Sequence, residues 1–517
     1  MSFCTVLSAA VQGLSVEMIR VEADVSNGLP MFHMVGYLSS EVKEASERVR
    51  TAIRNSGMKL PAKKIIVNLA PATVRKRGAS FDLPIALAVL AAMNYVPEEA
   101  LKGVAVIGEV SLEGKIRGVS GVLPIVMEAK NQGCTACILP EENEIEGRLV
   151  SGIKILPADN LEKLCAYLNG DEKEIHRKKQ GRSSAQRNIF ENKKEDFSDI
   201  CGQNAVKRAA EIAVAGGHNL LMAGPPGSGK SMIARRIATI LPELSLEESL
   251  EITRIYSVLG MIDKEQPLIT RRPFRSVHHT ITKTALVGGG MTPRPGEISM
   301  AHGGALFLDE LAEFPRNVLE VLRQPLEEHQ IHIARNYGNF TFPAEFMLVA
   351  AMNPCPCGNY PDMQKCSCTP SQIQKYLGKI SQPFLDRMDL CIETPKVEYL
   401  ELDIERIGKK EEESSEVIRS RVVEARKLQK KRYEGTQIRT NSMLGPGEIR
   451  TYIPLGSAER KLMEKAFERM GLTARTYHKI LRVARTIADL DYSEKVTEKH
   501  LKEAIAYRSL DKKYWGR

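Results

Sequence analysis

The chain has 517 residues, too many for a single hydrophobic core, and this length predicts about three domains. Hydrophobic residues make up 43% of the sequence, which excludes a disordered protein, and no run of about 18 apolar residues is present to span a membrane. Lysine and arginine outnumber aspartate and glutamate by 9 (73 against 64), a mildly basic balance that is compatible with a polyanionic partner without demonstrating one.

Residues 1–169 mix strand-like alternation with helical patterns and predict an α+β domain. The first basic residue is Arg20, so the charged start of a signal peptide is lacking and a cytoplasmic protein is expected. Residues 170–196 are charge-dense and almost free of apolar side chains, which is typical of an exposed linker. The basic run at 177–182 is interpreted as a solvated tether in preference to a nucleic-acid patch.

A catalytic core is predicted from 197 to 395, followed by a helical domain from 396 to 517. In the core, an apolar strand at 220–223 runs into a complete P-loop and then into a helix. The P-loop residues are Gly224, Pro225, Pro226, Gly227, Ser228, Gly229, Lys230 and Ser231. This arrangement presents backbone N–H groups and the helix dipole to a phosphate. Lys230 would reach the β- and γ-phosphates of ATP and Ser231 would hold Mg²⁺, so a nucleoside-triphosphate site is predicted.

The stretch from 271 to 296 contains basic side chains and no acidic one. A flexible surface loop is one interpretation; a mobile element that binds a phosphate backbone is favoured, because base-independent contacts need positive charge and pliable backbone. A second candidate is an alternating hairpin at 330–342, with Arg335 and Tyr337 near its tip, although an ordinary hairpin packed on the sheet would show the same pattern. The predicted DNA contacts are Arg272, Arg275, Lys283, Arg294 and Arg335.

Two carboxylates follow the apolar strand at 305–308. Asp309 would orient Mg²⁺ through its waters, and Glu310 would act as general base on the attacking water. A hydrolase needs one carboxylate on the metal and one free beside it, so hydrolysis of ATP is predicted as well as binding. An ordinary acidic turn is the alternative, and behind a P-loop it is the minor one.

Another apolar strand, 346–352, ends at Asn353, whose side chain could fix the lytic water against the γ-phosphate. Four cysteines follow in the pattern C-x-C-x8-C-x-C, at Cys355, Cys357, Cys366 and Cys368. Thiolates this close can surround one tetrahedral Zn²⁺. Since the spacing departs from the commoner C-x2-C pairs, reduced thiols without metal are the alternative.

Arg387 lies in an acidic turn punctuated by proline, where a local ion pair with Asp386 or Asp389 is the alternative to a role at a nucleotide. The P-loop, the Leu-Phe-Leu-Asp-Glu stretch at 306–310, Asn353 and Arg387, in this order, resemble an AAA+ ATPase. The stretches at 286–290, 293–298 and 353–358 are similar to the magnesium-chelatase-like branch of that class and, within it, to the ComM/YifB family. The resemblance covers essentially the whole chain.

This resemblance implies that Asn353 is sensor 1 and that Arg387 is an arginine finger, which reaches the nucleotide of a neighbouring subunit in a ring, expected to be a homohexamer. The sensor-2 arginine is either Arg475 or Arg482, and Arg475, at the start of its helix, is favoured. Such arginines neutralise charge that develops on the γ-phosphoryl group. The resemblance also implies that 271–296 is an insert within helix 2 and that 330–342 is a pre-sensor-1 hairpin.

The first domain resembles the Lon-protease-like fold through the stretches at 78–87, 108–110 and 139–143. Lon peptidases need a serine nucleophile and a lysine base. Asp82 and Leu123 align with those positions, and Ser80, two residues from Asp82, has no matching lysine. The domain is therefore predicted not to be proteolytic, and the resemblance implies a role in DNA binding or ring assembly.

These features predict an α/β protein with an AAA+ core, a Lon-like N-terminal domain and a C-terminal helical lid, which uses ATP, Mg²⁺ and, if the cysteines are metallated, Zn²⁺. The resemblance implies a hexameric motor on single-stranded or branched DNA, namely a branch-migration helicase in recombination and natural transformation. The alternative is a metal-chelatase-type motor subunit that remodels a protein partner. That alternative predicts no stimulation of the ATPase by DNA.

Overall fold

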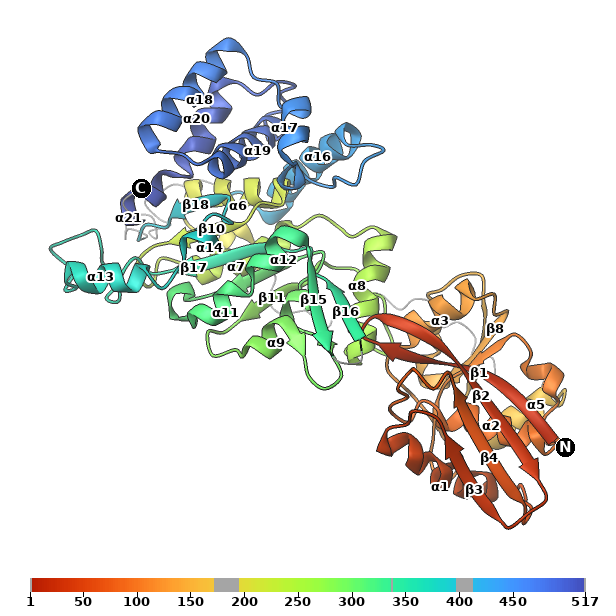
Figure 1. Cartoon of the computed structure of the whole chain (residues 1–517). Coiled ribbons are helices and arrows are strands. Elements are labelled where there is room, and N and C mark those ends of the chain that lie inside the picture. The colour runs from red at the N-terminus through yellow and green to blue at the C-terminus, as the bar shows by residue number, and fades with distance from the viewer. Residues whose placement is uncertain (1, 172–194, 336–337, 397–411, 516–517) are drawn as a thin grey trace.

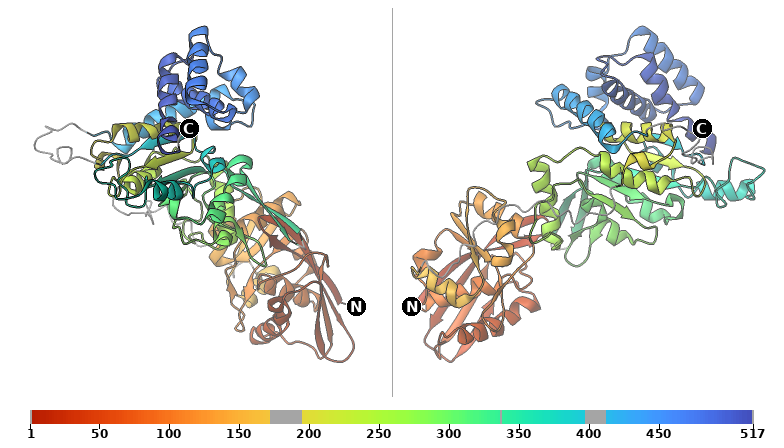
Figure 2. Two further views of the ribbon diagram at one scale, coloured as in Figure 1. Left: turned by 60° about the vertical axis from the view of Figure 1, so that its left-hand side comes forward. Right: turned by 180° about the vertical axis from the view of Figure 1, so that it is seen from behind.

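The computed structural model describes residues 2–171, 195–335, 338–396 and 412–515. They form an N-terminal part, a central part and a C-terminal helical part that follow one another along an elongated molecule (Figure 1; Figure 2). Most of the predicted linker, and Asn336 and Tyr337 of the predicted hairpin, lie outside these ranges. Among the helices within them, none is long and apolar enough to cross a bilayer.

The N-terminal part is built on a seven-stranded sheet of order β3-β4-β2-β1-β5-β8-β9. Its strands are β1 Ser2–Gln12, β2 Ser15–Ser26, β3 Met31–Val35, β4 Lys64–Ala70, β5 Val104–Val106, β8 Ala136–Pro140 and β9 Lys154–Ala158. Its main helices are α1 Ser40–Asn55, α2 Asp82–Ala92, α3 Val122–Asn131 and α5 Leu161–Leu168. All residues of α2 are buried, as expected for a helix that is apolar on every side. The mixture of helices and strands predicted for this region is confirmed.

The central part is a five-stranded sheet of order β11-β14-β17-β10-β18, in which all neighbours pair in parallel. Its strands are β10 Leu220–Ala223, β11 Phe274–Val277, β14 Ala305–Leu308, β17 Met347–Met352 and β18 Leu390–Glu393. Helices α6 Asn204–Gly216, α7 Lys230–Ile240 and α8 Leu246–Leu259 pack around it. Every residue of β10, β14 and β17 is buried, because a parallel sheet is covered on both faces.

Shorter elements interrupt this central pattern. The stretch after β11 forms α9 Lys283–Val287 and a small hairpin of β12 Gly288–Gly289 and β13 Arg294–Pro295. After β14 come α11 Arg316–Glu320, α12 Arg323–Glu328 and a second hairpin of β15 Gln330–Arg335 and β16 Gly338–Pro343. The alternating pattern of 330–342 therefore does form a hairpin. Helix α13 Pro370–Leu377 and helix α14 Gln382–Leu385 precede β18.

The C-terminal part is helical, as predicted. It contains α16 Ser415–Arg432, α17 Pro446–Tyr452, α18 Ser457–Met470, α19 Ala474–Leu490, α20 Glu498–Ala506 and α21 Ser509–Trp515. Helices α16 and α19 pack against α6, so the lid rests on the central sheet layer. A buried ion pair between Asp389 and Lys479, 3.1 Å apart, joins the two parts.

The N-terminal part docks on α8 and on the β15–β16 hairpin. Ser257 of α8 donates a 2.6 Å hydrogen bond from Oγ to the buried carboxylate of Glu146. Leu14, in the turn between β1 and β2, belongs to the same apolar cluster as Phe342 of the hairpin. In Figure 1 this turn lies at the base of β15 and β16.

Candidate nucleotide-binding site

The P-loop joins β10 to α7, and the side chain of Lys230 points back toward the carbonyl groups of the loop. The Lys230 ammonium donates to the carbonyl oxygens of Gly224 and Pro225, each at 2.8 Å. The side chain is nearly buried, and this desolvation lowers the pKa of Lys230 from its ordinary 10.5 to about 8. A phosphate beside Lys230 would stabilise the charged form, so the loop is suited to an anionic ligand.

The two residues predicted to hold Mg²⁺ are in contact. Ser231 donates from Oγ to Asp309 Oδ2 at 2.6 Å. Ser231 lies in the first turn of α7 and Asp309 directly follows β14, so the contact joins the P-loop helix to the sheet edge. A hydroxyl and a carboxylate oxygen are hard ligands of the kind that Mg²⁺ prefers, and the pair therefore fits this ion.

Glu310 has an unusual backbone conformation. Its φ of 52° places it in the left-handed region, where strained residues of functional sites are often found. The carboxylate is about half exposed, and its Oε2 atom lies 3.2 Å from Nδ1 of His279. His279 follows β11, which is the strand beside β14. Nothing in the sequence connects these two residues, because their contact depends on the order of the strands.

Asn353 lies at the same edge of the sheet. Strand β17 pairs in parallel with β10, with Met352 opposite Ala223, so the residues that follow both strands are neighbours. The Asn353 Oδ1 atom is 3.3 Å from the Lys230 ammonium. The predicted grouping of Lys230, Ser231, Asp309 and Asn353 is thus present in the structure.

Gln203 is a residue of this site that the sequence interpretation does not include. Its side-chain amide donates to the carbonyl oxygens of Ser228, at 2.9 Å, and Pro395, at 3.0 Å. It therefore ties the start of α6 to the P-loop and to the chain that leaves β18. The only feature of the sequence that could have indicated Gln203 is its position, as a polar residue directly before the helix that precedes the P-loop strand.

Arg387 and Arg475 meet at a single carboxylate. Arg387 Nη2 is 2.6 Å from Glu327 Oε1, and Arg475 Nη1 is 4.0 Å from the same oxygen. The Arg387 side chain is nearly buried and also donates from Nε to the carbonyl of Arg323 at 3.2 Å. Arg475 is largely exposed. Both candidate arginines therefore face α12, the helix that carries Glu327.

The partner of Arg387 is not one of the carboxylates beside it in the sequence. Asp389 pairs with Lys479, and Asp386 accepts a hydrogen bond from Gln382. Arg482, the other sensor-2 candidate, donates to the carbonyl of Ser442 at 2.7 Å.

The two elements predicted to contact DNA lie side by side. Arg335 of β15 donates from Nε to the carbonyl of Gly290, in the β12–β13 hairpin, at 3.4 Å. Lys283, Arg294 and Arg335 are exposed. Their positive charges are therefore accessible on neighbouring elements.

The other two predicted DNA contacts are half-buried and engaged in ion pairs. Arg272 pairs with Glu248 at 2.9 Å, and Arg275 pairs with Glu297 at 2.8 Å. Both glutamates lie outside the acid-free stretch, so the sequence pattern could not reveal these ion pairs. In this structure the charges of Arg272 and Arg275 are therefore paired within the chain.

The four cysteines lie together in the loop between β17 and α13. The sulfur atoms of Cys355 and Cys357 are 3.4 Å apart, those of Cys355 and Cys366 are 3.8 Å apart, and those of Cys357 and Cys366 are 3.6 Å apart. The Cys368 sulfur also lies within 4.8 Å of the others. Four thiolates at 2.3 Å from one tetrahedral Zn²⁺ would be about 3.8 Å from each other. The donor set and its size fit zinc.

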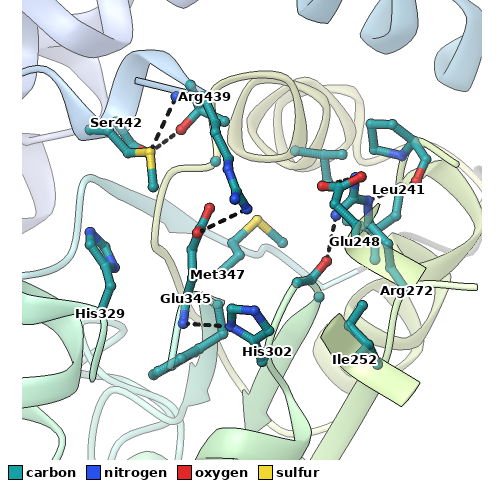
Figure 3. A pocket seen from close by; sticks show the side chains of 18 of the residues that line it. Leu241, Glu248, Ile252, Arg272, His302, His329, Glu345, Met347, Arg439 and Ser442 are labelled. Atoms are coloured by element: carbon teal, nitrogen blue, oxygen red, sulfur yellow. Dashed lines mark hydrogen bonds and ion pairs between the residues drawn. The ribbon is translucent and has the colours of Figure 1, made fainter. Parts of the chain in front are cut away.

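A separate pocket of about 100 Å³ lies at the opposite edge of the central sheet (Figure 3). It is lined by residues that precede β14 and β17 and by residues of the helical part. Three of its carboxylates are paired with basic side chains of the same pocket, as in the 3.4 Å contact between Arg439 and Glu345. Because the P-loop is at the carboxyl ends of the strands, this pocket is not the nucleotide site.

In the N-terminal part, the positions aligned with the Lon nucleophile and base carry no such pair. Asp82 is fully buried and accepts two 2.9 Å hydrogen bonds from Arg48, through Nε and Nη2. Burial raises the pKa of Asp82, an effect that these hydrogen bonds oppose. The backbone N–H of Leu123 donates to Glu146 at 2.8 Å. A structural ion pair and an apolar side chain thus occupy these positions.

A P-loop follows a central strand of a parallel sheet, a hydroxyl and a carboxylate that fit Mg²⁺ are in contact beside it, and a glutamate and an amide lie at neighbouring strand ends. This arrangement is that of a nucleotide site of the AAA+ class. Family models agree with this class over most of the chain. "Magnesium chelatase, subunit ChlI" matches residues 196–402, "Subunit ChlI of Mg-chelatase" matches 21–143, and "Magnesium chelatase, subunit ChlI C-terminal" matches 412–508.

Individual relatives narrow the class to a family. The chain is 44% identical to YifB of Escherichia coli K12 over 99% of its length and 98% of the relative's. It is 42% identical to the competence protein ComM of Haemophilus influenzae, with the same shares of the two chains covered. A shorter similarity, 26% identity over 160 residues, is to the Lon protease of Trichlorobacter lovleyi and covers 29% of this chain and 19% of that protein. The chain belongs to the ComM/YifB family of magnesium-chelatase-like AAA+ proteins.

Proposed function

We propose that the chain is an ATP-hydrolysing motor that acts on DNA. The observation that carries the ATPase is the 2.6 Å contact of Ser231 with Asp309 beside Lys230, with Glu310 next in sequence. Ser231 and Asp309 would hold Mg²⁺, which when bound neutralises charge on the β- and γ-phosphates. Lys230 would exchange its carbonyl partners for the phosphates.

Glu310 and Asn353 would act on the attacking water. Glu310 accepts its proton as general base, and Asn353 orients it from the end of β17. His279 Nδ1 lies 3.2 Å from the Glu310 carboxylate, so this contact has to shift when the carboxylate takes the proton of the water.

The site would be completed by a neighbouring subunit in a homohexameric ring. Arg387 is the proposed arginine finger and Arg475 the proposed sensor 2. Since both lie at Glu327, each has to leave this carboxylate before it can act at a γ-phosphate, which for Arg387 is that of the neighbouring subunit.

DNA is proposed as the substrate of the movement because Lys283 of α9, Arg294 of β13 and Arg335 of β15 are exposed, and the last two lie on adjacent hairpins. Phosphate contacts of this kind are independent of base sequence. The printed name of the Haemophilus relative, a competence protein, agrees with a role in natural transformation. Branch migration of recombining DNA is the specific activity that we propose.

The test is ATP turnover with and without single-stranded and branched DNA. We expect DNA to stimulate turnover, and Glu310→Gln to reduce it by about 10²–10⁴-fold while ATP still binds. Arg335→Ala should weaken DNA binding and reduce the slope of log affinity against log salt concentration by about one phosphate contact. Lys465 is an exposed lysine on α18, and Lys465→Ala should change neither quantity. Turnover indifferent to DNA, with no DNA binding at low salt, would instead favour a metal-chelatase-type motor that remodels a protein.

We also propose that Cys355, Cys357, Cys366 and Cys368 bind one Zn²⁺. Protein purified in a reducing, chelator-free buffer should contain about one zinc per chain, because four thiolates form a complete structural site. Replacement of Cys368 by serine should lower this content, whereas Cys134→Ser, in the N-terminal part, should not. Wild-type protein without zinc under these conditions would contradict the proposal.

A further inference from the structure

The four-cysteine loop, residues 355–368, lies directly against the nucleotide site. It starts two residues after Asn353, whose Oδ1 atom is 3.3 Å from the Lys230 ammonium. The loop therefore continues, without an intervening element, from a side chain that contacts the P-loop lysine.

A second contact between the cysteine loop and the P-loop is made at Gly358. Gly358 has a φ of 80°, and a methyl group at this position would lie 2.2 Å from Cδ of Pro226. Only glycine permits this close approach together with a left-handed backbone. Pro226 is the third residue of the P-loop, so the position of the cysteine loop limits where the P-loop can lie.

The loop is held by its four sulfur atoms and by the backbone hydrogen bonds of its turns, such as those that Lys365 and Cys366 donate to the Asp362 carbonyl at 3.1 and 2.8 Å. Cys355 is fully buried, and its Sγ accepts the backbone N–H of Tyr360 at 3.4 Å. Residues 355–368 contain no helix or strand of their own. In such a segment a bound metal supplies much of the order, because ligand binding free energy becomes folding free energy.

We propose that a metal ion on the four cysteines supports the P-loop through Gly358 and Asn353, so that nucleotide affinity depends on metal occupancy. This inference rests on the proposed zinc site and the proposed nucleotide site. Coupling between two ligands is reciprocal, so bound nucleotide should in turn slow the loss of the metal. Both effects are predicted for the single chain, without a ring or DNA.

The experiment compares three forms of the full chain: zinc-loaded, stripped with a chelator that is then removed, and stripped and reloaded with zinc. Binding of a fluorescent ATP analogue with Mg²⁺ is the measurement, and thermal unfolding confirms that the stripped chain is folded. We expect about tenfold weaker binding in the stripped form, since a P-loop that is no longer held in place must be ordered by the nucleotide, and recovery on reloading.

Two glycine variants separate the contact from general backbone strain. Gly358→Ala keeps all four cysteines and should retain about one zinc but bind the analogue about tenfold more weakly. Gly57→Ala is the matched control, because Gly57 also has a φ of 80° but has no atom within 4 Å of the added methyl. It should bind the analogue like the wild type.

Zinc release to a coloured chelator gives an independent measurement. ADP with Mg²⁺ should slow release from the wild type and have little effect on release from Gly358→Ala. Unchanged nucleotide affinity in the folded, stripped chain, or release indifferent to ADP, would overturn the coupling alone. A chain without zinc overturns the metal site, and a zinc-loaded chain that binds no nucleotide overturns the nucleotide site.

Discussion

Among single residues, Lys230 is the one whose surroundings make the nucleotide site sensitive to pH. Lys230 is nearly buried with carbonyl groups as its closest partners, and Asp309 is the carboxylate that attracts it. Burial lowers the pKa of Lys230 to about 8. Near this pH a part of the protein without nucleotide therefore has an uncharged Lys230, whereas phosphate binding needs the charged form. This makes nucleotide affinity dependent on pH.

We predict that affinity for ATP with Mg²⁺ is nearly constant below pH 8 and falls above it. Bound phosphates stabilise the charged lysine and so raise its pKa. Above about pH 8 the free protein has largely lost this proton, so nucleotide binding has to take up a proton from solution and becomes weaker as the pH rises. The dissociation constant should then rise by up to about tenfold per pH unit. Titration with a fluorescent ATP analogue from about pH 7 to pH 9.5 measures the slope.

Lys230→Arg is the control for this effect, because a guanidinium group stays charged over the whole range. Its affinity should be lower or similar at pH 7 but independent of pH up to about 9.5. A wild-type dissociation constant that does not change over the same range would contradict the assigned cause.

Residues of the site differ in how far the sequence could predict them. Lys230 and Ser231 follow from the P-loop, in which neighbours along the chain fix the geometry. The contact of His279 with Glu310, and that of Arg387 with Glu327, join segments that are distant in sequence, and no local pattern encodes either pair. The ion pairs of Arg272 with Glu248 and of Arg275 with Glu297 could not be predicted for the same reason, because each partner is more than 20 positions away in the sequence.

At the scale of elements, the parallel sheet explains why the site forms. Strands β10, β14 and β17 are adjacent and run in the same direction, so the residues after their carboxyl ends meet at one edge. Their apolar runs predict these three strands, because a strand covered on both faces needs continuous hydrophobic residues. Their order in the sheet, and the position of β11 beside β14, are set by packing and are not visible in the pattern.

The two hairpins also differ in how well the sequence predicts them. Alternation predicts β15 and β16, whereas β12 and β13 are only two residues each and carry no recognisable period. Their contact, from Arg335 to the carbonyl of Gly290, places the basic side chains of both hairpins on neighbouring elements. A surface that could follow a phosphate backbone therefore arises from two elements, each of which alone resembles an ordinary turn.

At the scale of the whole molecule, the N-terminal part is fixed to the elements that carry the proposed DNA contacts. The turn between β1 and β2 packs Leu14 near the β15–β16 hairpin, and Arg254 of α8 donates from Nε to the Leu14 carbonyl at 3.2 Å. The positions aligned with a Lon-type nucleophile and base, Asp82 and Leu123, take part in structural contacts. This suits a domain that positions the motor instead of one that cleaves peptides.

The docking of the N-terminal part should depend on one buried carboxylate more than on the exposed charges around it. Glu146 is nearly buried and accepts hydrogen bonds from the Ser257 hydroxyl at 2.6 Å and from the Leu123 backbone at 2.8 Å. Removing the hydroxyl in Ser257→Ala leaves this carboxylate short of a donor and should cost about 1.5–3 kcal/mol. Lys264 pairs with Glu142 across the same interface, but both side chains are exposed, so Lys264→Ala should cost about 0–1 kcal/mol.

Calorimetric unfolding of the two variants, together with hydrogen exchange at the Gly121 amide, which donates to the Ser257 carbonyl at 2.9 Å, measures the difference. Ser257→Ala should lower the unfolding temperature of the N-terminal part and speed exchange at Gly121, while Lys264→Ala should change neither by much. Because the β1–β2 turn contacts the hairpin, Ser257→Ala should also weaken stimulation of ATP turnover by DNA more than it weakens basal turnover. Equal effects of the two variants on exchange would mean that the buried carboxylate does not determine the docking.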